Sequence, residues 1–414
     1  MTASRNANGY AITSRNYFSE LGELLKKNFD SASRSSICEA RKKLHWGAFE
    51  YLLHQSRLED QGSCYQWKGH NVRAIDGTKL TLPHSPEIIK EFPQRRDGRS
   101  GILSHYPFSI LVTASDVFTG QPLAARMANM HGSERGEAIS MIQNDFAPGD
   151  IVLLDRGLDG IRVWRALDEQ KQFYISRLKE VGKSGHMHLQ YVHEFILSGK
   201  KDKIIKRKTK DPITSKWVIF RIRLIRGRKL KDGSVLVVGT NLYCPKKYPP
   251  QDILQLYAKR WNVETMYARV KTLFSIEEFH AKSPNGILQE VFSNLLVLSL
   301  TAKMAVQAAS MHGTNITKVA PNFKNAAEVL RRNLFYRLGV APLGPRNRLK
   351  KAKQIIAEIM SVLCKKQPGR SYPRYSRKPV NRWPYAKASK IEMHAHGRRS
   401  NESKWARVKH DKLP

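Results

Sequence analysis

The stretch DIVLLDRG, residues 150–157, joins a short apolar run to a polar turn. A run of this length bounded by turn residues is typical of a strand that is buried on both faces of a sheet. Asp155 stands at the end of the run, where an ionised carboxylate is costly unless it is paired or bound to a metal ion. A DRG sequence can also form a simple turn. The stretch therefore predicts a central strand and leaves two roles open for Asp155.

The segments around this strand alternate between strand and helix patterns. In chain order they are a strand with a turn (71–82), two strands around a glycine turn (107–129), a helix (133–146), the strand just described, a second helix (161–170) and a further strand (172–178). Alternation of this kind indicates a mixed α/β core. The first strand contains Asp76 within RAIDGT, where the DG pair again fits either a turn or a site residue.

The rest of the chain divides by composition and pattern. We expect a helical region (1–68), the first part of the α/β core (69–178), a basic, β-rich insertion (179–240), a second part of the core with a helix that carries Glu264 (241–310), a C-terminal helical region (311–366) and a basic, disordered tail (367–414). The N-terminal helices fit either a helix-turn-helix-like DNA reader or an ordinary basic bundle. The tail combines Pro, Gly, Arg and Lys with little apolar pattern, which is typical of segments that fold on nucleic acid.

The net charge is the strongest feature of the composition. The 414 residues include 72 Lys plus Arg against 35 Asp plus Glu, a formal charge of +37. An excess of this size favours a polyanionic partner, because each neutralised phosphate releases counterions. A basic ribosomal protein or a protein of the membrane surface is the alternative.

Cysteine usage and apolar patterns bear on the compartment. The four cysteines are far apart and form no CxxC pair, so we expect a reducing compartment and neither a disulfide framework nor a zinc ribbon. The N-terminus has no apolar signal segment. The longest apolar stretch, residues 291–306, is expected to be a buried helix because it is too short and too polar to span a membrane. These features predict a cytoplasmic protein.

The stretch YAKRWNVETMYARVK, residues 257–271, predicts an amphipathic helix. At roughly 100° per residue, one side of that helix carries Tyr257, Arg260, Glu264 and Lys271, with Trp261 at its edge. The opposite side is apolar, so one face packs on the core and the other presents a carboxylate between two cations. A solvated face with incidental ion pairs four residues apart is the alternative.

Three carboxylates on an α/β core indicate metal-dependent chemistry. Asp76 and Asp155 lie in or after apolar strands, and Glu264 lies on the polar face of the helix. Carboxylate oxygens suit Mg²⁺, and a pair of such ions suits phosphoryl transfer on a nucleic acid. The strongly basic charge of the chain agrees with this chemistry.

The order and spacing of these residues resemble a known family. Asp76 in a strand, Asp155 in DRG and the Y-x2-R-x3-E-x6-K pattern of residues 257–271 look like the DDE transposases of bacterial insertion sequences. They match in particular the insertion-sequence-four type, which carries the YREK signature. The basic insertion before Glu264 also matches, and the resemblance covers roughly residues 70–310. The signature is specific, whereas each aspartate alone is not.

This resemblance implies a ribonuclease-H-like fold, in which a mixed sheet is interrupted by the β-rich insertion and flanked by helical N-terminal and C-terminal regions. It implies that Asp76 on the first strand, Asp155 after the fourth and Glu264 on a later helix are both catalytic residues and metal ligands. They would hold two Mg²⁺ ions, with Mn²⁺ able to replace them, for attack of water or a 3′-hydroxyl on a phosphodiester.

The resemblance also implies contacts with DNA. Arg260 and Lys271 would face the phosphates beside the metal ions, and Arg156 would add a further contact. Tyr257 would donate a hydrogen bond to a phosphate. Trp261 is a candidate to stack on a flipped base, as aromatic residues do in relatives that form hairpin DNA ends; packing between helices is the alternative.

We therefore expect a transposase that excises and integrates an insertion sequence by a cut-and-paste route. It would bind double-stranded DNA, both terminal inverted repeats and target, as a homodimer or higher oligomer, with no membrane partner, at the cytoplasmic nucleoid. The alternatives are a metal-dependent nuclease or resolvase on the same fold and a domesticated DNA-binding protein without transposition activity. A glycosidase with paired carboxylates is disfavoured by the net charge and by the basic residues that flank Glu264.

Two other groups of residues are expected to have no special role. His186, His188 and His193 lie close together, and we interpret them as one face of a strand rather than a zinc site. Glu134 and Glu137 stand at the start of a predicted helix and are expected to be solvated.

Overall fold

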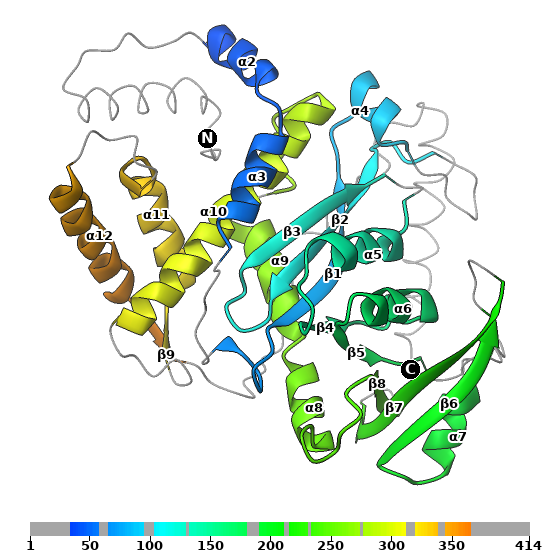
Figure 1. Ribbon diagram of the computed structural model, residues 1–414. Helices are drawn as coiled ribbons and strands as arrows, with labels where there is room; N and C mark the ends of the chain where they lie inside the picture. Colours follow the sequence, from blue (N-terminus) through cyan, green and yellow to red (C-terminus); the bar gives the residue numbers. More distant parts are fainter. Residues whose placement is uncertain are drawn as a thin grey trace, which may run out of the picture.

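The computed structural model describes residues 34–57, 65–94, 103–129, 132–179, 190–210, 215–230, 233–273, 276–311, 319–337 and 344–365. The predicted tail, 367–414, and the start of the N-terminal helical region lie outside these ranges. Figure 1 shows one large twisted sheet with helices on both faces and a further group of helices beside it.

The sheet has eight strands in the order β3-β2-β1-β4-β5-β8-β7-β6. Their bounds are β1 (Val72–Thr81), β2 (Phe108–Asp116), β3 (Pro122–Ala128), β4 (Ile151–Leu154), β5 (Phe173–Arg177), β6 (Asp202–Lys210), β7 (Trp217–Lys229) and β8 (Val235–Thr240). β1, β4 and β5 are parallel, and β2 is antiparallel to both of its neighbours. A 3-2-1-4-5 order with an antiparallel second strand is the ribonuclease-H-like arrangement, so the predicted fold class is confirmed.

Helices cover both faces of the sheet. One face is covered by α5 (Glu134–Asn144), α6 (Ile161–Glu169) and α7 (Gln190–Leu197). The other is covered by α3 (Gly47–Gln55), α4 (Pro86–Glu91), α8 (Pro250–Ala258), α9 (Trp261–Leu273) and α10 (Pro284–Met311). The predicted helical regions are present at both ends of the described chain.

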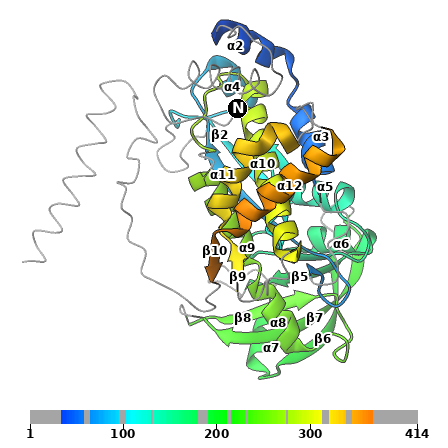
Figure 2. The ribbon, with the colours of Figure 1, turned by 90° about the vertical axis from the view of Figure 1, so that its left-hand side faces the viewer.

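The terminal helices are α2 (Arg34–Lys43), α11 (Phe323–Arg337) and α12 (Pro345–Met360). The last two pack with α10 in an apolar cluster of their own (Figure 2). Two short antiparallel strands, β9 (Val319–Pro321) and β10 (Leu363–Lys365), pair beside this helical group.

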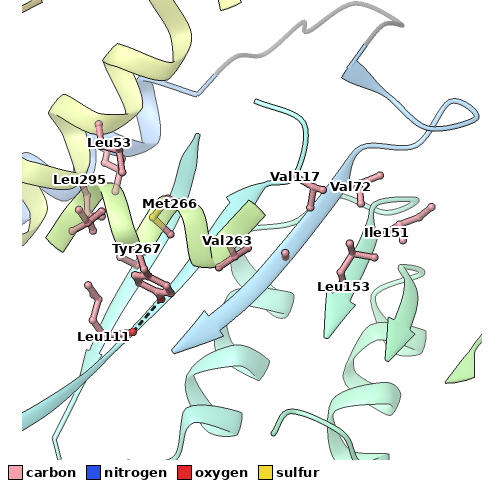
Figure 3. Packing of buried hydrophobic residues seen from close by; sticks show 14 of the residues in the cluster. Leu53, Val72, Leu111, Val117, Ile151, Leu153, Val263, Met266, Tyr267 and Leu295 are labelled. Carbon is pink, nitrogen blue, oxygen red and sulfur yellow. Dashed lines mark hydrogen bonds between the residues drawn. The ribbon is translucent and has the colours of Figure 1, made fainter. Parts of the chain in front are cut away.

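The buried strand β4 separates the two apolar layers. Ile151 and Leu153 pack on the side of α8, α9 and α10, whereas Val152 and Leu154 pack on the side of α5 and α6. All four side chains are fully buried, and burying each contributes roughly 1.5–3 kcal/mol. Figure 3 shows Ile151 and Leu153 beside Val72 of β1. The sequence prediction of a central strand is correct because every residue of this run has an apolar neighbour.

The RAIDGT segment forms no turn. β1 continues through it, and Asp76 and Gly77 lie opposite Thr113 and Val112 of β2. The predicted turn at the DG pair is therefore wrong. The strand persists because β2 pairs with it along nearly its whole length, which offsets the low strand propensity of Asp and Gly.

The basic insertion extends the main sheet. β8 pairs with β5, and β7 and β6 follow it outward, so the three strands of the insertion continue the main sheet. The insertion also contains the helix α7, which carries His193. The predicted strand face at His193 is therefore wrong, and His186 and His188 lie outside the described residues.

The long helix α10 passes through the centre of the helical layer (Figure 1). Among the described helices, it is the one whose length and apolar composition would suffice to cross a membrane. It is longer than the sequence analysis allowed, with 28 residues, and 56% of its most apolar window is buried inside the protein. It packs against α3, α9, α11 and α12, as a core helix does.

Candidate active site

Asp76 and Asp155 come together where two parallel strands part. Ala74 of β1 lies opposite Leu153 of β4, and the same register carried two residues further places Asp76 opposite Asp155. Ala74 and Leu153 both pack on the face that α8 and α9 cover. Side chains alternate along a strand, so the Asp76 carboxylate projects toward that same face. Asp155 directly follows the end of β4 and is close enough for its charge to act on Asp76.

The carboxyl of Asp76 is less acidic than usual. Burial, together with the charges of Asp155 and Glu134, raises the pKa of Asp76 to about 6. The charge of Arg260 and the amide of Gly77, which donates to Oδ1 at 3.0 Å, oppose this rise. A carboxylate in such surroundings gains from a nearby cation, because the cation offsets the unfavourable free energy of ionisation.

Asp155 is oriented by the turn that follows β4. Its Oδ1 accepts hydrogen bonds from the amides of Gly157 at 2.8 Å and Leu158 at 2.9 Å. Asp155 is therefore a turn residue that also lies beside Asp76, so the two roles left open by the sequence coexist. Arg156, the next residue, is exposed at the same edge of the sheet.

Residues 257–271 do not form one continuous helix. α8 ends at Ala258 and α9 begins at Trp261, with Lys259 and Arg260 in a tight turn between them. Hydrogen bonds between residues three apart join the two helices. The prediction of a single helix is therefore wrong. The segment contains no Pro or Gly, the residues that usually signal such a break.

Two tyrosines fasten these helices to the strands that carry the aspartates. Tyr257, at the end of α8, donates to the carbonyl oxygen of Leu154 at 3.2 Å, directly before Asp155. Tyr267, on α9, donates to the carbonyl oxygen of Asp76 at 2.6 Å, and Figure 3 shows its ring directed at the strands. Both tyrosines are buried. Here the Tyr257 hydroxyl contacts the backbone, and its predicted contact with a phosphate stays a prediction.

Arg260 links Glu264 to Asp76. Its guanidinium donates to Oε1 of Glu264 at 2.9 Å and lowers the pKa of Asp76. The Arg260 side chain is 12% exposed and that of Glu264 is 41% exposed, so the pair reaches from the interior to the solvent. Arg260 lies in the turn between α8 and α9, and from there its guanidinium contacts Glu264 on α9 and its charge acts on Asp76 of β1.

Trp261 and Lys271 lie toward opposite ends of α9. Trp261 is 64% exposed, and the guanidinium carbon of Arg260 lies 5.9 Å from the centre of its ring. This exposure favours base stacking over the packing alternative. Lys271 binds Glu277 at 3.1 Å and the carbonyl oxygen of Lys79 at 3.4 Å. The DNA contacts of both residues stay predictions.

The donor set fits an oxygen-ligated divalent cation. Asp76 and Asp155 place two carboxylates side by side in a partly buried position, with Arg260 as a counter-charge. Within the described ranges, no three Asp, Glu, His or Cys side chains already surround a common metal position. Glu264 is bound to Arg260 and would exchange that partner to become a third ligand.

Two residues of this site, Glu134 and Tyr267, were not among the predicted site residues. Glu134, the first residue of α5, is half-buried and interacts with Asp155 and Asp76 instead of facing solvent. Tyr267 lies on the side of the segment that was expected to be apolar, yet its hydroxyl donates a hydrogen bond to the backbone of Asp76. Gly77, the residue after Asp76, was a local signal in the sequence that another group approaches the strand closely. The sequence did not show that this group is Glu134.

Comparison with known proteins agrees with this site. Residues 67–300, more than half of the chain, match the family described as Transposase DDE domain. The chain is 24% identical over 299 residues to the transposase InsG for insertion sequence element IS4 of Escherichia coli (strain K12), covering 69% of this chain and 64% of that protein. It is 22% identical over 296 residues to the transposase for insertion sequence element IS231F of Bacillus thuringiensis subsp. israelensis, covering 61% and 60%. The chain thus spans less than two thirds of the length of these relatives.

A cryo-EM structure of the piggyBac transposase synaptic complex with hairpin DNA is a more distant match, with 12% identity and a TM-score of 0.42 over 79% of this chain and 65% of that chain. A likeness this remote adds nothing to the topology and geometry described above. The family match, in contrast, encloses Asp76, Asp155 and Glu264, and the first of the relatives bears out the resemblance to the insertion-sequence-four type. This chain belongs to the Transposase DDE domain family.

Proposed function

We propose that this protein is the transposase of an insertion sequence, which cuts the element from donor DNA and joins it to a target. The observation that carries the proposal is the proximity of Asp76 on β1 to Asp155 directly after the neighbouring parallel strand β4, with Glu264 one ion pair away through Arg260. Such a centre suits attack on a phosphodiester by water or by a 3′-hydroxyl, since neither needs a covalent protein intermediate.

Family membership implies use of a divalent metal ion. We propose two Mg²⁺ ions, replaceable by Mn²⁺, held by Asp76, Asp155 and Glu264; when bound they supply stabilisation of the attacking and leaving oxygens. Arg260, released from Glu264, then has a planar guanidinium free to bind two phosphate oxygens. Tyr257 and Tyr267 hold the backbone beside each aspartate, so the carboxylates keep their positions while the DNA moves.

The partner is double-stranded DNA, in the form of terminal inverted repeats and target. The net charge of +37 supports this choice, because the chain can neutralise many phosphates. The exposed edge with Arg156, and Trp261 beside Arg260, would contact DNA near the carboxylates. Joining two element ends calls for two active sites, so we propose a homodimer or higher oligomer on DNA.

Two other functions share this site. A metal-dependent nuclease or resolvase would cut DNA without joining it, and a domesticated DNA-binding protein would do neither. The presence of all three carboxylates with an intact Arg260–Glu264 pair favours a catalytic protein over a domesticated one.

The test is incubation of the full chain with Mg²⁺ and donor DNA that carries the element ends, followed by addition of target DNA. Excision products and joined products are separated on a gel. Glu264→Gln should reduce excision by at least about 100-fold, as loss of an electrostatic stabiliser does, and leave DNA binding nearly intact.

Glu169→Gln is the matched control, because Arg165 and Glu169 on α6 form the same Arg–Glu pair four residues apart at 3.2 Å. Cleavage without joining would favour the nuclease. Near wild-type excision by Glu264→Gln would return Glu264 to the role of a surface ion-pair residue.

A further inference from the structure

Glu134 extends the carboxylate centre beyond the three residues that the family signature names. It is the first residue of α5, and Ser133 before it caps the helix through the amide of Gly136. An acidic residue in a first helical turn ordinarily faces solvent, where the helix dipole favours it. The Glu134 carboxylate is instead turned inward and lies against Gly77 of β1. Burial and then the charge of Asp155 raise the pKa of Glu134.

Gly77 makes this inward position possible. A Cβ atom at residue 77 would lie 2.3 Å from Oε1 of Glu134 and 2.8 Å from its Cδ, distances that real side chains do not reach. The Glu134 carboxylate therefore occupies the space that a side chain after Asp76 would need. Strand alternation turns position 77 to the α5 side of β1, so Glu134 approaches from the opposite face to Glu264 on α9.

The local charge balance is negative. Asp76, Asp155 and Glu134 repel one another, and Arg260 and Arg135 are the cations that oppose this repulsion. Both arginines are also engaged elsewhere. Arg260 binds Glu264, and Nε of Arg135 donates to the carbonyl oxygen of Gly157 at 3.0 Å. A divalent cation shared by the three carboxylates would convert their repulsion into attraction.

Resting on the proposed function, we propose that Glu134 is a further ligand of the divalent cation held by Asp76 and Asp155. With Glu264 bound to Arg260, Glu134 would supply the third carboxylate, turning its side chain from Gly77 toward the two aspartates as the cation binds. Mg²⁺ and Mn²⁺ accept several oxygen ligands in octahedral geometry, so a cation bound by three carboxylates retains positions for water and for phosphate oxygens. Glu134 thus holds the cation in the protein before DNA arrives, and Glu264 joins when it leaves Arg260.

The test measures Mn²⁺ binding to the full chain without DNA, from the loss of the electron paramagnetic resonance signal of free Mn²⁺. Glu134→Gln should weaken binding at least about tenfold, because even residues that only support a metal ligand have effects of that size. Glu137→Gln, in the same turn of α5, is the matched control and should bind as the wild type does. Asp76→Asn is the reference for loss of an aspartate ligand.

Each result decides one of the two proposals. If Asp76→Asn loses Mn²⁺ and Glu134→Gln does not, Glu134 is a structural residue and the proposed function stands. If Asp76→Asn also binds normally, the proposed metal centre itself is wrong. Thermal melting without Mn²⁺ checks each fold. Should Glu134→Gln unfold, Glu134→Asp carries the test: its shorter side chain should weaken Mn²⁺ binding several-fold, and unchanged binding overturns the inference.

Discussion

At the scale of single residues, the site is a balance between buried acids and a few cations. Asp76 is largely buried, and the charge of Arg260 interacts with both Asp76 and Glu264. The sequence predicted the identity of these groups, because a carboxylate inside an apolar strand is chemically conspicuous. It could not predict Glu134, whose role depends on where α5 lies in space.

The first prediction concerns Asp76 in the absence of divalent ions. Its pKa is about 6 in the folded protein and about 3.9 in an unfolded chain, so the stability it contributes below about pH 4 is lost as the pH rises through about 6. Asp76→Asn should therefore raise the free energy of unfolding at pH 7 by about 1–2 kcal/mol, with allowance for partial solvation, and leave it unchanged near pH 4.

Urea unfolding at the two pH values measures this difference. Asp252→Asn is the control, because Asp252 forms a partly exposed ion pair with Lys68 and should show no gain at pH 7. A variant Asp76→Asn protein that is less stable than the wild type at pH 7 would show that Arg260 outweighs burial at this carboxyl.

The second prediction concerns Trp261, whose ring is 64% exposed beside Arg260. Trp261→Ala should leave DNA binding, metal binding and first-strand nicking intact. The later step that holds a base out of the duplex should slow by roughly 10- to 100-fold, because base–aromatic stacking is worth about 1–3 kcal/mol. Nicked and double-strand-broken products are timed separately. A parallel fall of both would assign Trp261 to a general role in the protein.

At the scale of elements, long-range contacts decide the geometry. The break between α8 and α9 has no local signal in the sequence. It is held by hydrogen bonds to distant segments: Tyr257 to Leu154 of β4, and Nδ2 of Asn262 to the carbonyl oxygen of Val117, in the turn after β2, at 2.8 Å. Likewise, β8 pairs with β5, although the sequence of neither strand indicates which strand it will pair with. Periodicity along the chain reports local structure only, so it could predict neither the helix break nor the pairing of β8 with β5.

The β6–β7 hairpin presents one face to solvent. On that face β6 residues lie opposite β7 residues in three pairs, Lys206 with Arg221, Lys208 with Ile219 and Lys210 with Trp217. Trp217 is 63% exposed, and Nζ of Lys208 lies 5.4 Å from the centre of its ring. Basic residues interleaved with an exposed aromatic ring are typical of surfaces that follow a nucleic-acid backbone.

The third prediction follows from this face. Replacing Lys206, Lys208 and Lys210 with Gln should reduce the slope of log affinity against log salt by about 0.9 for each lysine that contacts a phosphate. Fluorescence anisotropy with labelled element-end DNA, over a series of salt concentrations, measures the slope. Cleavage at saturating protein should be little changed. An unaltered slope would place the hairpin away from the DNA.

At the scale of the whole molecule, a buried polar cluster joins three distant segments. Oγ of Ser56, after α3, lies 2.7 Å from Oγ of Ser299 on α10. Nε2 of Gln121, in the turn between β2 and β3, donates to Oγ of Ser299 and to the carbonyl oxygen of Ser56, both at 2.9 Å. The N-terminal helices, the sheet and the central helix are thereby fixed to one another.

The fourth prediction is that Gln121→Ala lowers the free energy of unfolding by about 1–3 kcal/mol, because it leaves buried partners unsatisfied. Gln66→Ala, at an exposed position, should change it by less than about 0.5 kcal/mol. Urea denaturation followed by circular dichroism measures both. Equal stability of the two variants would mean that the cluster does not couple these segments.

The sequence by itself determined which carboxylates are candidates for catalysis and the order in which the chain presents them. Some features are local or additive and can be read directly from the sequence. They are the three carboxylates Asp76, Asp155 and Glu264, the apolar run of β4 and the large positive charge. The tertiary structure alone decided how these parts meet. The turn at Arg260, the continuous β1 and the approach of Glu134 over Gly77 arise from contacts between segments far apart in the chain. The free energies of these contacts depend on how close the segments lie in the folded protein. The sequence of any one segment does not contain that information.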